Sequence, residues 1–515
     1  MNYTSSVYDL VLSLTKTEKR YFKLFARLNK EKSNLIRLFD AISINGLHHD
    51  KEVKAYFSAE PFIKHFDVYK VHLKDSILQS MRNFHQNRNL HNVLQNNLED
   101  AWFLYEKGLF KQCGKLIERS KQLARESENN TVLLALLDLE YKIPVAKDIY
   151  PHNNKKLNQL FKDQNAILTK LHDEFLISYQ ITSAGLLLKK FEFTCSETDY
   201  FELVKVLAEL NNSERILSSA LQRKFYTVKV EFFMVIHQYT EAKLHVDLLI
   251  NVFENSNLII RENIGRYIKA LQDRITCCIQ LKQFEEALKR NDDLKQAPNR
   301  FDKIQKRNTK ILSLIDGYYL QNKLRTYLHC GEMEKSEICV AEIDVFISQK
   351  RKQISDVLLI ELIILIAYYF FMKQEHRKAE AILGLHKINI SGIKSSEQTI
   401  DLFLLKYLIA YSSGKMKERG PLLRSLYRIL LIRKGLTQFE QTCFDFIKRS
   451  ATKKEPSRSK RTWENLLLQE LYKQEASPTW YARSIRFDLI SWLESRQEKK
   501  PFYHILALKY LLAGK

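Results

Sequence analysis

The sequence predicts an all-α protein built as a stack of helix hairpins, that is, an α-solenoid. The 515 residues include 13 glycines and 8 prolines, well below ordinary usage, so the chain has few helix breakers. Apolar residues recur with helical spacing, and no run alternates between apolar and polar residues as a half-buried strand does. A short elbow also recurs between apolar runs, which is typical of stacked helical repeats.

The elbow consists of a spacer residue, a large side chain two positions later and usually a small side chain three positions after that. The small residue lets two helix backbones approach near the turn, and the large one fills the gap between neighbours. The elbows are Gly108-Phe110-Cys113, His237-Tyr239-Ala242, Lys282-Phe284-Ala287, Gly331-Met333-Ser336, Gln374-His376-Ala379 and Gly414-Met416-Arg419. His376 and Arg419 depart from the pattern, and we expect Arg419 to mark the approach to a polar-faced cap.

The spacing of the elbows predicts the repeat length. From position 242 onward, successive elbows lie 45, 49, 43 and 40 residues apart. The first gap, from 113 to 242, is 129 residues, or three units of 43, so it has room for two further hairpins. We expect them at Asn153–Phe193 and Tyr200–Lys224, and we assign residues 96–435 to the repeats.

Two stretches carry a family resemblance: WFLYEKGLFKQCGKLIERSKQLA at 102–124 and CCIQLKQFEEALKRNDDL at 277–294. They resemble the tetratricopeptide (TPR) superfamily, and the likeness extends over residues 97–430. That family has a small residue twelve positions before the small residue of the elbow, which here only Ala101 and Ala367 supply. The resemblance implies a protein or peptide partner on the concave face. The clamp residues of the chaperone-binding branch have no counterparts at matching positions.

Residues 1–95 are expected to form a separate N-terminal helical domain. Thr15, with Glu18 three positions later, has the spacing of a capping box, so a helix should begin after Thr15. The opening LTKTEKRYF resembles the start of bacterial TPR-like proteins, and this likeness implies no activity. A helix-turn-helix made of Asp50–Phe57 and Tyr69–Phe84 is an alternative interpretation, although the usual turn glycine is absent.

Residues 436–515 are expected to form a basic helical C-terminal cap. From 411 to 515 the chain has 22 Lys and Arg against 10 Asp and Glu, within a formal net charge of +22. We expect an exposed loop at 447–461 and helices at 463–472 and 481–493. The candidate anion-binding residues are Arg424, Arg428, Arg433, Lys448, Arg449, Lys453, Lys454, Arg458, Lys460 and Arg461. Three interpretations stay open: a solvated connector, a site for nucleic-acid phosphates, or a site for an acidic protein or membrane surface.

No motif indicates catalysis, a cofactor or a bound metal. Phosphate-binding loops, the H-E-x-x-H and G-x-S-x-G patterns and C-x-x-C pairs are absent from the sequence. The 7 cysteines are scattered and odd in number, which favours reduced thiols in the cytoplasm. The most apolar window, Val357–Met372, contains Glu361 and is shorter than the roughly 20 residues of a membrane span, so it predicts a buried helix.

These observations favour a non-enzymatic, cytoplasmic scaffold that binds a protein or peptide through the first helices of successive hairpins. The candidate partner-binding residues are Tyr267, Arg274, Tyr319, Arg325 and Tyr368, and core packing is the alternative role for each aromatic. The alternative function is a nucleic-acid-binding regulator that uses the basic C-terminal region or the N-terminal helical domain. Such binding should fall by orders of magnitude between about 50 and 200 mM salt. An enzyme would need a pocket of converging titratable groups.

Overall fold

The computed structural model confirms the all-α class for the part of the chain that it describes, in which all regular structure is helical. The described residues are 6–28, 33–47, 49–86, 90–146, 155–194, 197–211, 218–255, 259–260, 263–301, 308–385, 397–432, 442, 444–446, 448, 457–476 and 488–513. The chain forms two compact units, unit 1 (Met1–His172) and unit 2 (Asp173–Lys515).

Unit 1 begins with helices around an apolar core of their own. The helices are α1 (Ser6–Ser13), α2 (Lys16–Arg27), α3 (Ser33–Ser43), α4 (Asp50–Tyr56), the 3-10 helix η2 (Pro61–His65) and α5 (Phe66–His85). Thr15 caps α2 as predicted: its side chain accepts from the Glu18 backbone N–H (3.3 Å), and its own N–H donates to the Glu18 carboxylate (2.8 Å). Phe22 and Phe39, both fully buried, pack in the core with ring centroids 4.5 Å apart.

The predicted helix-turn-helix pair lacks the short turn that defines this motif. Residues 57–65, which include η2, separate α4 from α5, whereas the motif uses a turn of about three or four residues. Asp50, at the start of α4, instead links this helix to α1 and α5. Its carboxylate accepts from the Tyr8 hydroxyl at 2.8 Å and from the Lys70 ammonium at 2.7 Å.

A second apolar cluster of unit 1 lies between α6 (Leu90–Glu106), α7 (Phe110–Glu126), α8 (Asn130–Ala146) and the start of α9 (Lys155–Thr194). Ala101 and Cys113 are fully buried where α6 meets α7, and the Cys113 thiol donates to the Ala101 carbonyl at 3.2 Å. The small side chains allow this close approach, as the elbow pattern predicted.

Each of the six predicted elbows is a turn between two helices, and the second helix begins at the large residue of the elbow. The remaining pairs are α11 (Ser219–Val235) with α12 (Tyr239–Glu254), α14 (Ile264–Gln280) with α15 (Phe284–Gln296), α16 (Thr309–Cys330) with α17 (Met333–Lys350), α18 (Asp356–Met372) with α19 (His376–Leu385), and α20 (Glu397–Ser412) with α21 (Met416–Ile432).

The spacer residue ends the first helix by adopting a left-handed conformation in all six elbows. The φ angles are 70° at Gly108, 59° at His237, 58° at Lys282, 73° at Gly331, 62° at Gln374 and 75° at Gly414. Backbone hydrogen bonds then close the helix end: Lys282 N–H donates to Ile279 (3.0 Å), and Gln283 N–H donates to Cys278 (2.8 Å). This pattern is a Schellman cap, which satisfies carbonyls that would otherwise lack partners.

The last residue of each elbow is buried. Cys113, Ala242, Ala287, Ser336 and Ala379 have no exposed surface, and Arg419 is 4% exposed. Arg419, the departure from the pattern, lies over the Tyr411 ring at 4.8 Å and donates to the Tyr411 carbonyl at 3.2 Å. The last hairpin therefore replaces a small residue by a charged one that stacks on an aromatic ring.

The hairpin predicted at Asn153–Phe193 is wrong. One continuous helix, α9, covers positions 155–194, and α10 (Glu197–Asn211) follows it. The physical reason is the absence of a helix end: the stretch has no proline, and its one glycine, Gly185, does not adopt the left-handed conformation found at the elbows. The other predicted stretch, Tyr200–Lys224, holds parts of α10 and α11 together with residues outside the described ones.

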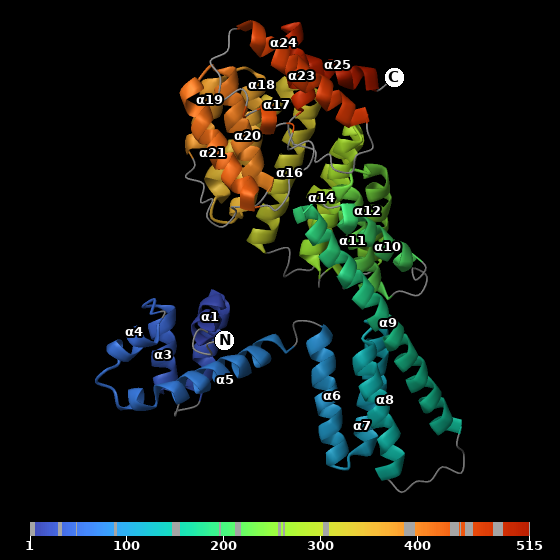
Figure 1. The fold of residues 1–515 in the computed structure, drawn as a ribbon. Helices are drawn as coiled ribbons and strands as arrows, with labels where there is room; N and C mark the ends of the chain where they lie inside the picture. The colour runs from blue at the N-terminus through green and yellow to red at the C-terminus, as the bar shows by residue number, and fades with distance from the viewer. Residues whose placement is uncertain are drawn as a thin grey trace. The chain divides into compact units, whose positions relative to one another are not determined.

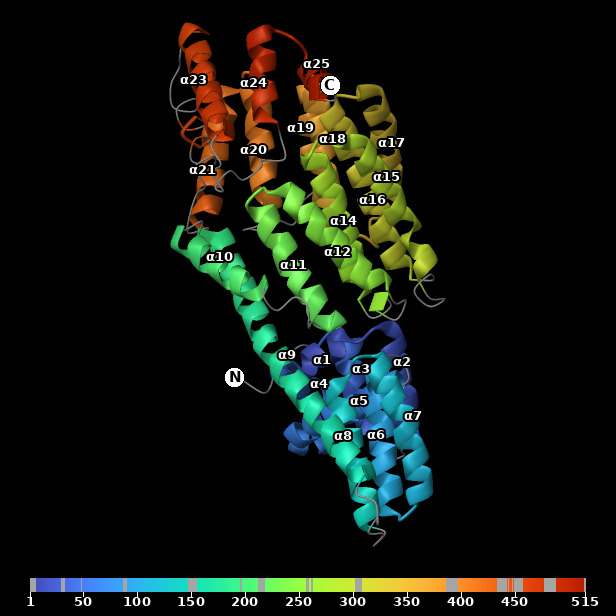
Figure 2. The same ribbon diagram turned by 90° about the vertical axis from the view of Figure 1, so that its right-hand side faces the viewer.

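In unit 2 the helices from α11 to α21 pack in chain order, side by side (Figures 1 and 2). Each second helix packs on the first helix of its own hairpin, and the first helices α14, α16, α18 and α20 also contact one another in sequence. The first helices consequently form a continuous layer that can present one set of side chains in a row.

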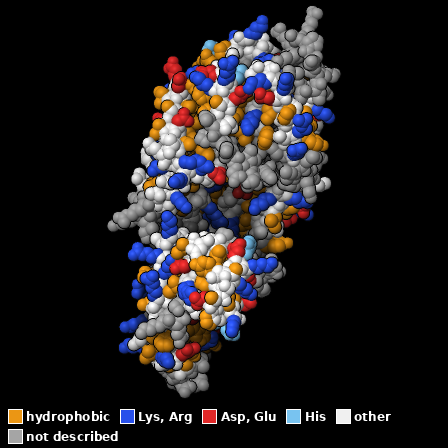
Figure 3. Space-filling view, turned by 90° about the vertical axis from the view of Figure 1, so that its left-hand side faces the viewer, with side chains coloured by type: hydrophobic (Ala, Val, Ile, Leu, Met, Phe, Trp, Pro, Cys, Tyr) orange, Lys and Arg blue, Asp and Glu red, His pale blue; other side chains and the backbone are white. Residues whose placement is uncertain are grey.

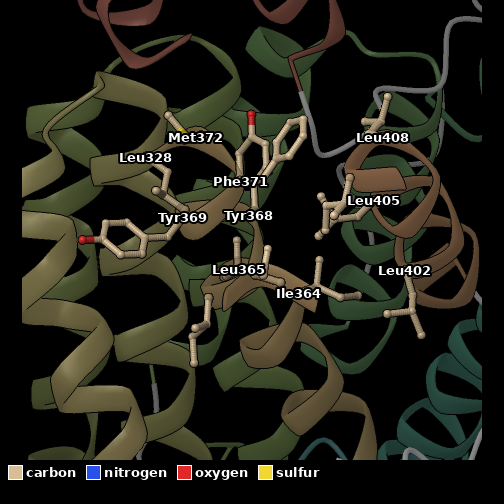
Figure 4. Packing of buried hydrophobic residues seen from close by; sticks show 14 of the residues in the cluster. Leu328, Ile364, Leu365, Tyr368, Tyr369, Phe371, Met372, Leu402, Leu405 and Leu408 are labelled. Atoms are coloured by element: carbon tan, nitrogen blue, oxygen red, sulfur yellow. The ribbon is translucent and has the colours of Figure 1, made fainter. Parts of the chain in front are cut away.

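The apolar helix α18 lies inside this layer, as predicted for the window Val357–Met372. Its positions from 358 to 369 are all buried, and the cluster around it extends to α16 and α20. Figure 4 shows Tyr368 and Phe371 on α18 and Leu402, Leu405 and Leu408 on α20 within this core. None of the described helices is long and apolar enough to cross a membrane.

The described part of the C-terminal region forms α23 (Ser457–Ala476), α24 (Leu489–Glu498) and α25 (Phe502–Ala513). Residues 457–461, predicted as loop, belong to α23, because this run contains no proline or glycine and its Lys and Arg residues are good helix formers. Trp492 is 4% exposed and packs on Phe371 and Tyr411. Trp480 and the side chain of Trp463 lie outside the described residues.

Candidate functional site

The five predicted partner-binding residues lie on the first helices, but they do not share one exposed face. Tyr267 is 1% exposed, and its hydroxyl donates to the Glu254 carboxylate on α12 at 2.8 Å. Tyr368 is 4% exposed and packs against Phe502 of α25, with ring centroids 6.0 Å apart. Both rings are therefore occupied by contacts within the chain.

Arg274 of α14 is directed towards the second helices. Its guanidinium pairs with Asp247 on α12 at 3.5 Å and with Asp293 on α15 at 3.2 Å. Its side chain is 11% exposed, so this pair of contacts joins the two neighbouring hairpins.

Tyr319 and Arg325 of α16 are both half-buried. The Lys295 ammonium lies 4.2 Å from the Tyr319 ring centroid, and the Asn291 side chain donates to the Tyr319 carbonyl at 2.9 Å. Tyr319 therefore faces α15. Burial lowers the pKa of His329 to about 4, and the Arg325 charge adds to this effect.

A different set of side chains crosses the layer of first helices. We call it the polar row, and it consists of Glu231 on α11, Lys269 and Asp273 on α14, Tyr318 and Gln321 on α16, and Glu361 on α18. Lys269 donates to Asp273, and Gln321 donates to Glu361. Beside the row, Gln272 and Asn322 exchange two hydrogen bonds of 3.1 and 2.8 Å between α14 and α16. Polar contacts thus link the successive hairpins.

The charged groups of the polar row differ in exposure: Lys269 and Glu231 are open to solvent, whereas Asp273 and Glu361 are buried. The Lys269 side chain is 67% exposed and the Asp273 side chain 13%. Burial raises the pKa of Asp273, and the Lys269 charge offsets only part of that rise. For Lys269 itself, the effect of burial is to lower the pKa, but Asp273 more than compensates and the pKa is raised.

Among the described residues of the row, Glu231 makes no ion pair as close as that between Lys269 and Asp273. The residue is exposed, but the protein around its carboxyl group removes part of the surrounding water and raises its pKa. The charge of Lys269 offsets part of this rise. Burial together with the charge of Glu361 also raises the pKa of Tyr318. The row therefore holds charged and hydrogen-bonding groups that have lost water without all gaining strong partners in the chain.

The polar row was missed at the sequence level because a helix turns by about 100° per residue. Tyr318, which faces the row, precedes Tyr319, which faces α15, and Lys269 follows Tyr267 by two positions. The periodicity was nevertheless available: Gln272 and Asn322 are 50 positions apart and Gln321 and Glu361 are 40 apart, close to the elbow spacing.

The candidate anion-binding residues are described only in part. Arg424 and Arg428 on α21 are exposed, and so is Lys448. Arg458, Lys460 and Arg461 belong to α23, with their side chains outside the described residues, and Arg433, Arg449, Lys453 and Lys454 lie wholly outside them. On the face drawn in Figure 3, basic side chains are interspersed with acidic and apolar ones.

Two further observations bear on chemistry and relationship. Over the described part of the chain, no three His, Cys, Asp or Glu side chains come together as a possible metal site. Comparison with protein-family models and with curated proteins finds no match for this chain.

Proposed function

We propose that this chain is a non-catalytic, TPR-like α-solenoid that binds a protein or peptide partner along the polar row. The observation that carries the proposal is the row itself, because it crosses four first helices and keeps Lys269 and Glu231 open to solvent. A partner lying across successive hairpins would complete the hydrogen bonds of these groups. Protein around the Glu231 carboxyl disfavours its charged form, which costs stability, and a binding role accounts for its presence.

We further propose that the scaffold acts in the cytoplasm. The support comes from the thiols: the described cysteines Cys113, Cys277, Cys278, Cys330 and Cys339 are all free and buried. Burial raises the pKa of Cys278 to about 11, so this thiol stays protonated and unreactive near neutral pH. Such cysteines serve as small core residues, which suits a reducing compartment.

The experiment is a tagged pull-down from the native cell, with each lysate split into nuclease-treated and untreated halves. One bait is the wild-type chain, and a second carries Glu231→Lys with Lys269→Glu, which keeps the net charge. The matched control carries Glu285→Lys with Lys289→Glu on α15, a helix that contributes no residue to the row and on which both side chains are exposed.

The proposal predicts a stoichiometric protein that survives nuclease, is kept by the control bait and is lost by the polar-row bait. Material that disappears with nuclease, accompanied by nucleic acid in the untreated half, would contradict it and would favour phosphate binding instead. Equal recovery on all three baits would show that the polar row is not the binding site.

A further inference from the structure

The polar row has an excess of negative charge, although the whole chain has a formal net charge of +22. It contains the carboxyl groups of Glu231, Asp273 and Glu361 and one ammonium group, that of Lys269. When all four groups are ionised, the carboxylates therefore outnumber the cation by two. A ligand attracted to the row has the opposite charge to one attracted to the chain as a whole.

Lys269 neutralises only one of the three carboxylates. Its ammonium lies 2.5 Å from the Asp273 carboxylate, one turn further along α14. Glu361 on α18 accepts a hydrogen bond from the side-chain amide of Gln321, which is a neutral donor. The ion pairs among the described residues do not include Glu231 on α11. The one positive charge of the row is thus already used by Asp273.

Glu231 is the carboxylate of the row that a ligand can reach, because its side chain is exposed. Loss of surrounding water is the largest effect on its pKa, which is raised. The charge of Asp273 adds to this rise, while Lys269 and Lys189 on α9 offset part of it. A cation bound beside Glu231 would favour its charged form.

The row also holds a buried acceptor that lacks a donor. Gln321 donates through its amide nitrogen to the Glu361 carboxylate, which as an anion only accepts, so the orientation of the amide is fixed. Its side-chain oxygen Oε1 has no hydrogen-bond partner among the described residues, although Gln321 is only 4% exposed. Buried acceptors in proteins are normally hydrogen-bonded. Glu231 and Gln321 therefore both call for a ligand that donates hydrogen bonds.

We propose that the partner bound along the polar row is a basic segment, in which an arginine or lysine side chain pairs with Glu231. This inference rests on the proposed function and names the chemistry of its partner. Both side chains bring the positive charge and the N–H donors that the row lacks. Arginine suits the site best, because its guanidinium carries five N–H donors in a fixed arrangement and can serve acceptors on neighbouring helices.

Tyr318 on α16 suits the same kind of ligand. It is half-buried, and it lies close enough to Asp273, Glu361 and Lys269 for their charges to influence its pKa. Guanidinium and ammonium groups bind over aromatic rings as well as to carboxylates. An acidic segment would instead meet three like charges, so the row favours a basic partner.

The test is a selection of peptides by the purified full chain from a phage-displayed library of random sequences. The proposal expects the selected peptides to be enriched in arginine or lysine. Non-specific attraction to a chain with a net charge of +22 would enrich aspartate and glutamate instead. Glu231→Gln should weaken a selected peptide about tenfold. The matched control Glu285→Gln, an exposed carboxylate on α15, should bind like the wild type.

A double-mutant cycle identifies the pairing. The basic residue of the peptide is replaced by citrulline, for arginine, or by norleucine, for lysine, each of which keeps the length of the side chain and removes its charge. This change should weaken binding to the wild type about tenfold and should affect the Glu231→Gln chain much less, because the pair is already broken there.

The outcomes separate this inference from the proposed function. A benzophenone side chain at position 269 reports whether a selected peptide lies on the row. Peptides that cross-link there without enrichment in basic residues, or that lose equal affinity on both chains when their charge is removed, would overturn the inference alone. Selected peptides that never cross-link at position 269 would contradict the proposed function as well.

Discussion

Gln321 on α16 donates a hydrogen bond from its side-chain amide to the carboxylate of Glu361 on α18, 40 positions later in the chain. Both side chains are buried, with exposed fractions of 4% and 8%. The bond joins the first helices of successive hairpins, and its span is close to the 43 residues between the elbow positions 336 and 379. The polar row therefore follows the spacing of the hairpins along the chain.

Replacing Gln321 by methionine should destabilise unit 2. The variant keeps the shape of the side chain but removes the donor, so the buried Glu361 carboxylate loses a partner. We expect the free energy of unfolding to fall by about 1–3 kcal/mol, measured by urea denaturation. Adding Glu361→Met should recover part of the loss, because the carboxylate that lost this donor is then removed. A Gln321→Met chain as stable as the wild type would contradict this account of the bond.

Replacing Lys282 by glycine should stabilise the protein. Lys282 has φ 58°, a conformation that costs an L-residue about 1–2 kcal/mol and glycine almost nothing. Glycine also loses more entropy on folding, so the expected net gain in unfolding free energy is about 0.5 kcal/mol. Thermal unfolding of the two chains measures it. A lower melting temperature would mean that the Lys282 side chain makes a contact worth more than the backbone strain.

Gly331→Ala should cost more than Gly414→Ala, although both glycines have similar φ angles of 73° and 75°. A methyl group at 331 would lie 2.5 Å from the Tyr503 carbonyl oxygen of α25, whereas nothing lies within 4 Å at 414. We expect a loss of about 1 kcal/mol at 414 from backbone strain and a clearly larger loss at 331. Urea denaturation of both variants measures the difference. Equal losses would show that α25 does not pack tightly on this turn.

Replacing Glu231 by glutamine should stabilise the chain at neutral pH. Burial raises the pKa of this carboxyl above its usual 4.5, so the folded state binds the proton more tightly than the unfolded state. The stability that protonation contributes is present at low pH and disappears as the pH rises through the folded pKa. The variant should therefore be slightly more stable than the wild type at pH 7, by a small amount because solvent screens the exposed group, and equally stable at pH 4. Unfolding in urea at both pH values tests the sign, and a variant that is less stable at pH 7 would contradict it.

The hairpins could be predicted from the sequence because each elbow is a local signal. A residue that adopts the left-handed conformation, such as Gly331, ends the first helix of all six elbows, and a small buried residue such as Ser336 follows in five of them. The capping box at Thr15 and Glu18 was predicted for the same reason: the cap joins residues only three positions apart.

The features that depend on longer-range packing were not predicted. Nothing within Lys155–Thr194 marks the length of α9, because a helix continues until some residue ends it. The face that each first helix presents depends on contacts with distant helices, so the sequence predicts Tyr319 as a binding residue although its neighbour Tyr318 faces the polar row. Adjacent positions on a helix point about 100° apart, so an error of one position selects a different face of the helix.

The central claim, that a protein partner binds along the polar row, is tested most directly by site-specific photo-cross-linking in the native cell. A benzophenone side chain would replace Lys269 in one chain and Lys289 of α15 in a control chain, both exposed positions. The account predicts that position 269 gives a discrete covalent adduct with another protein, resistant to nuclease, and that position 289 does not. No adduct at 269, or the same adducts at both positions, would contradict it.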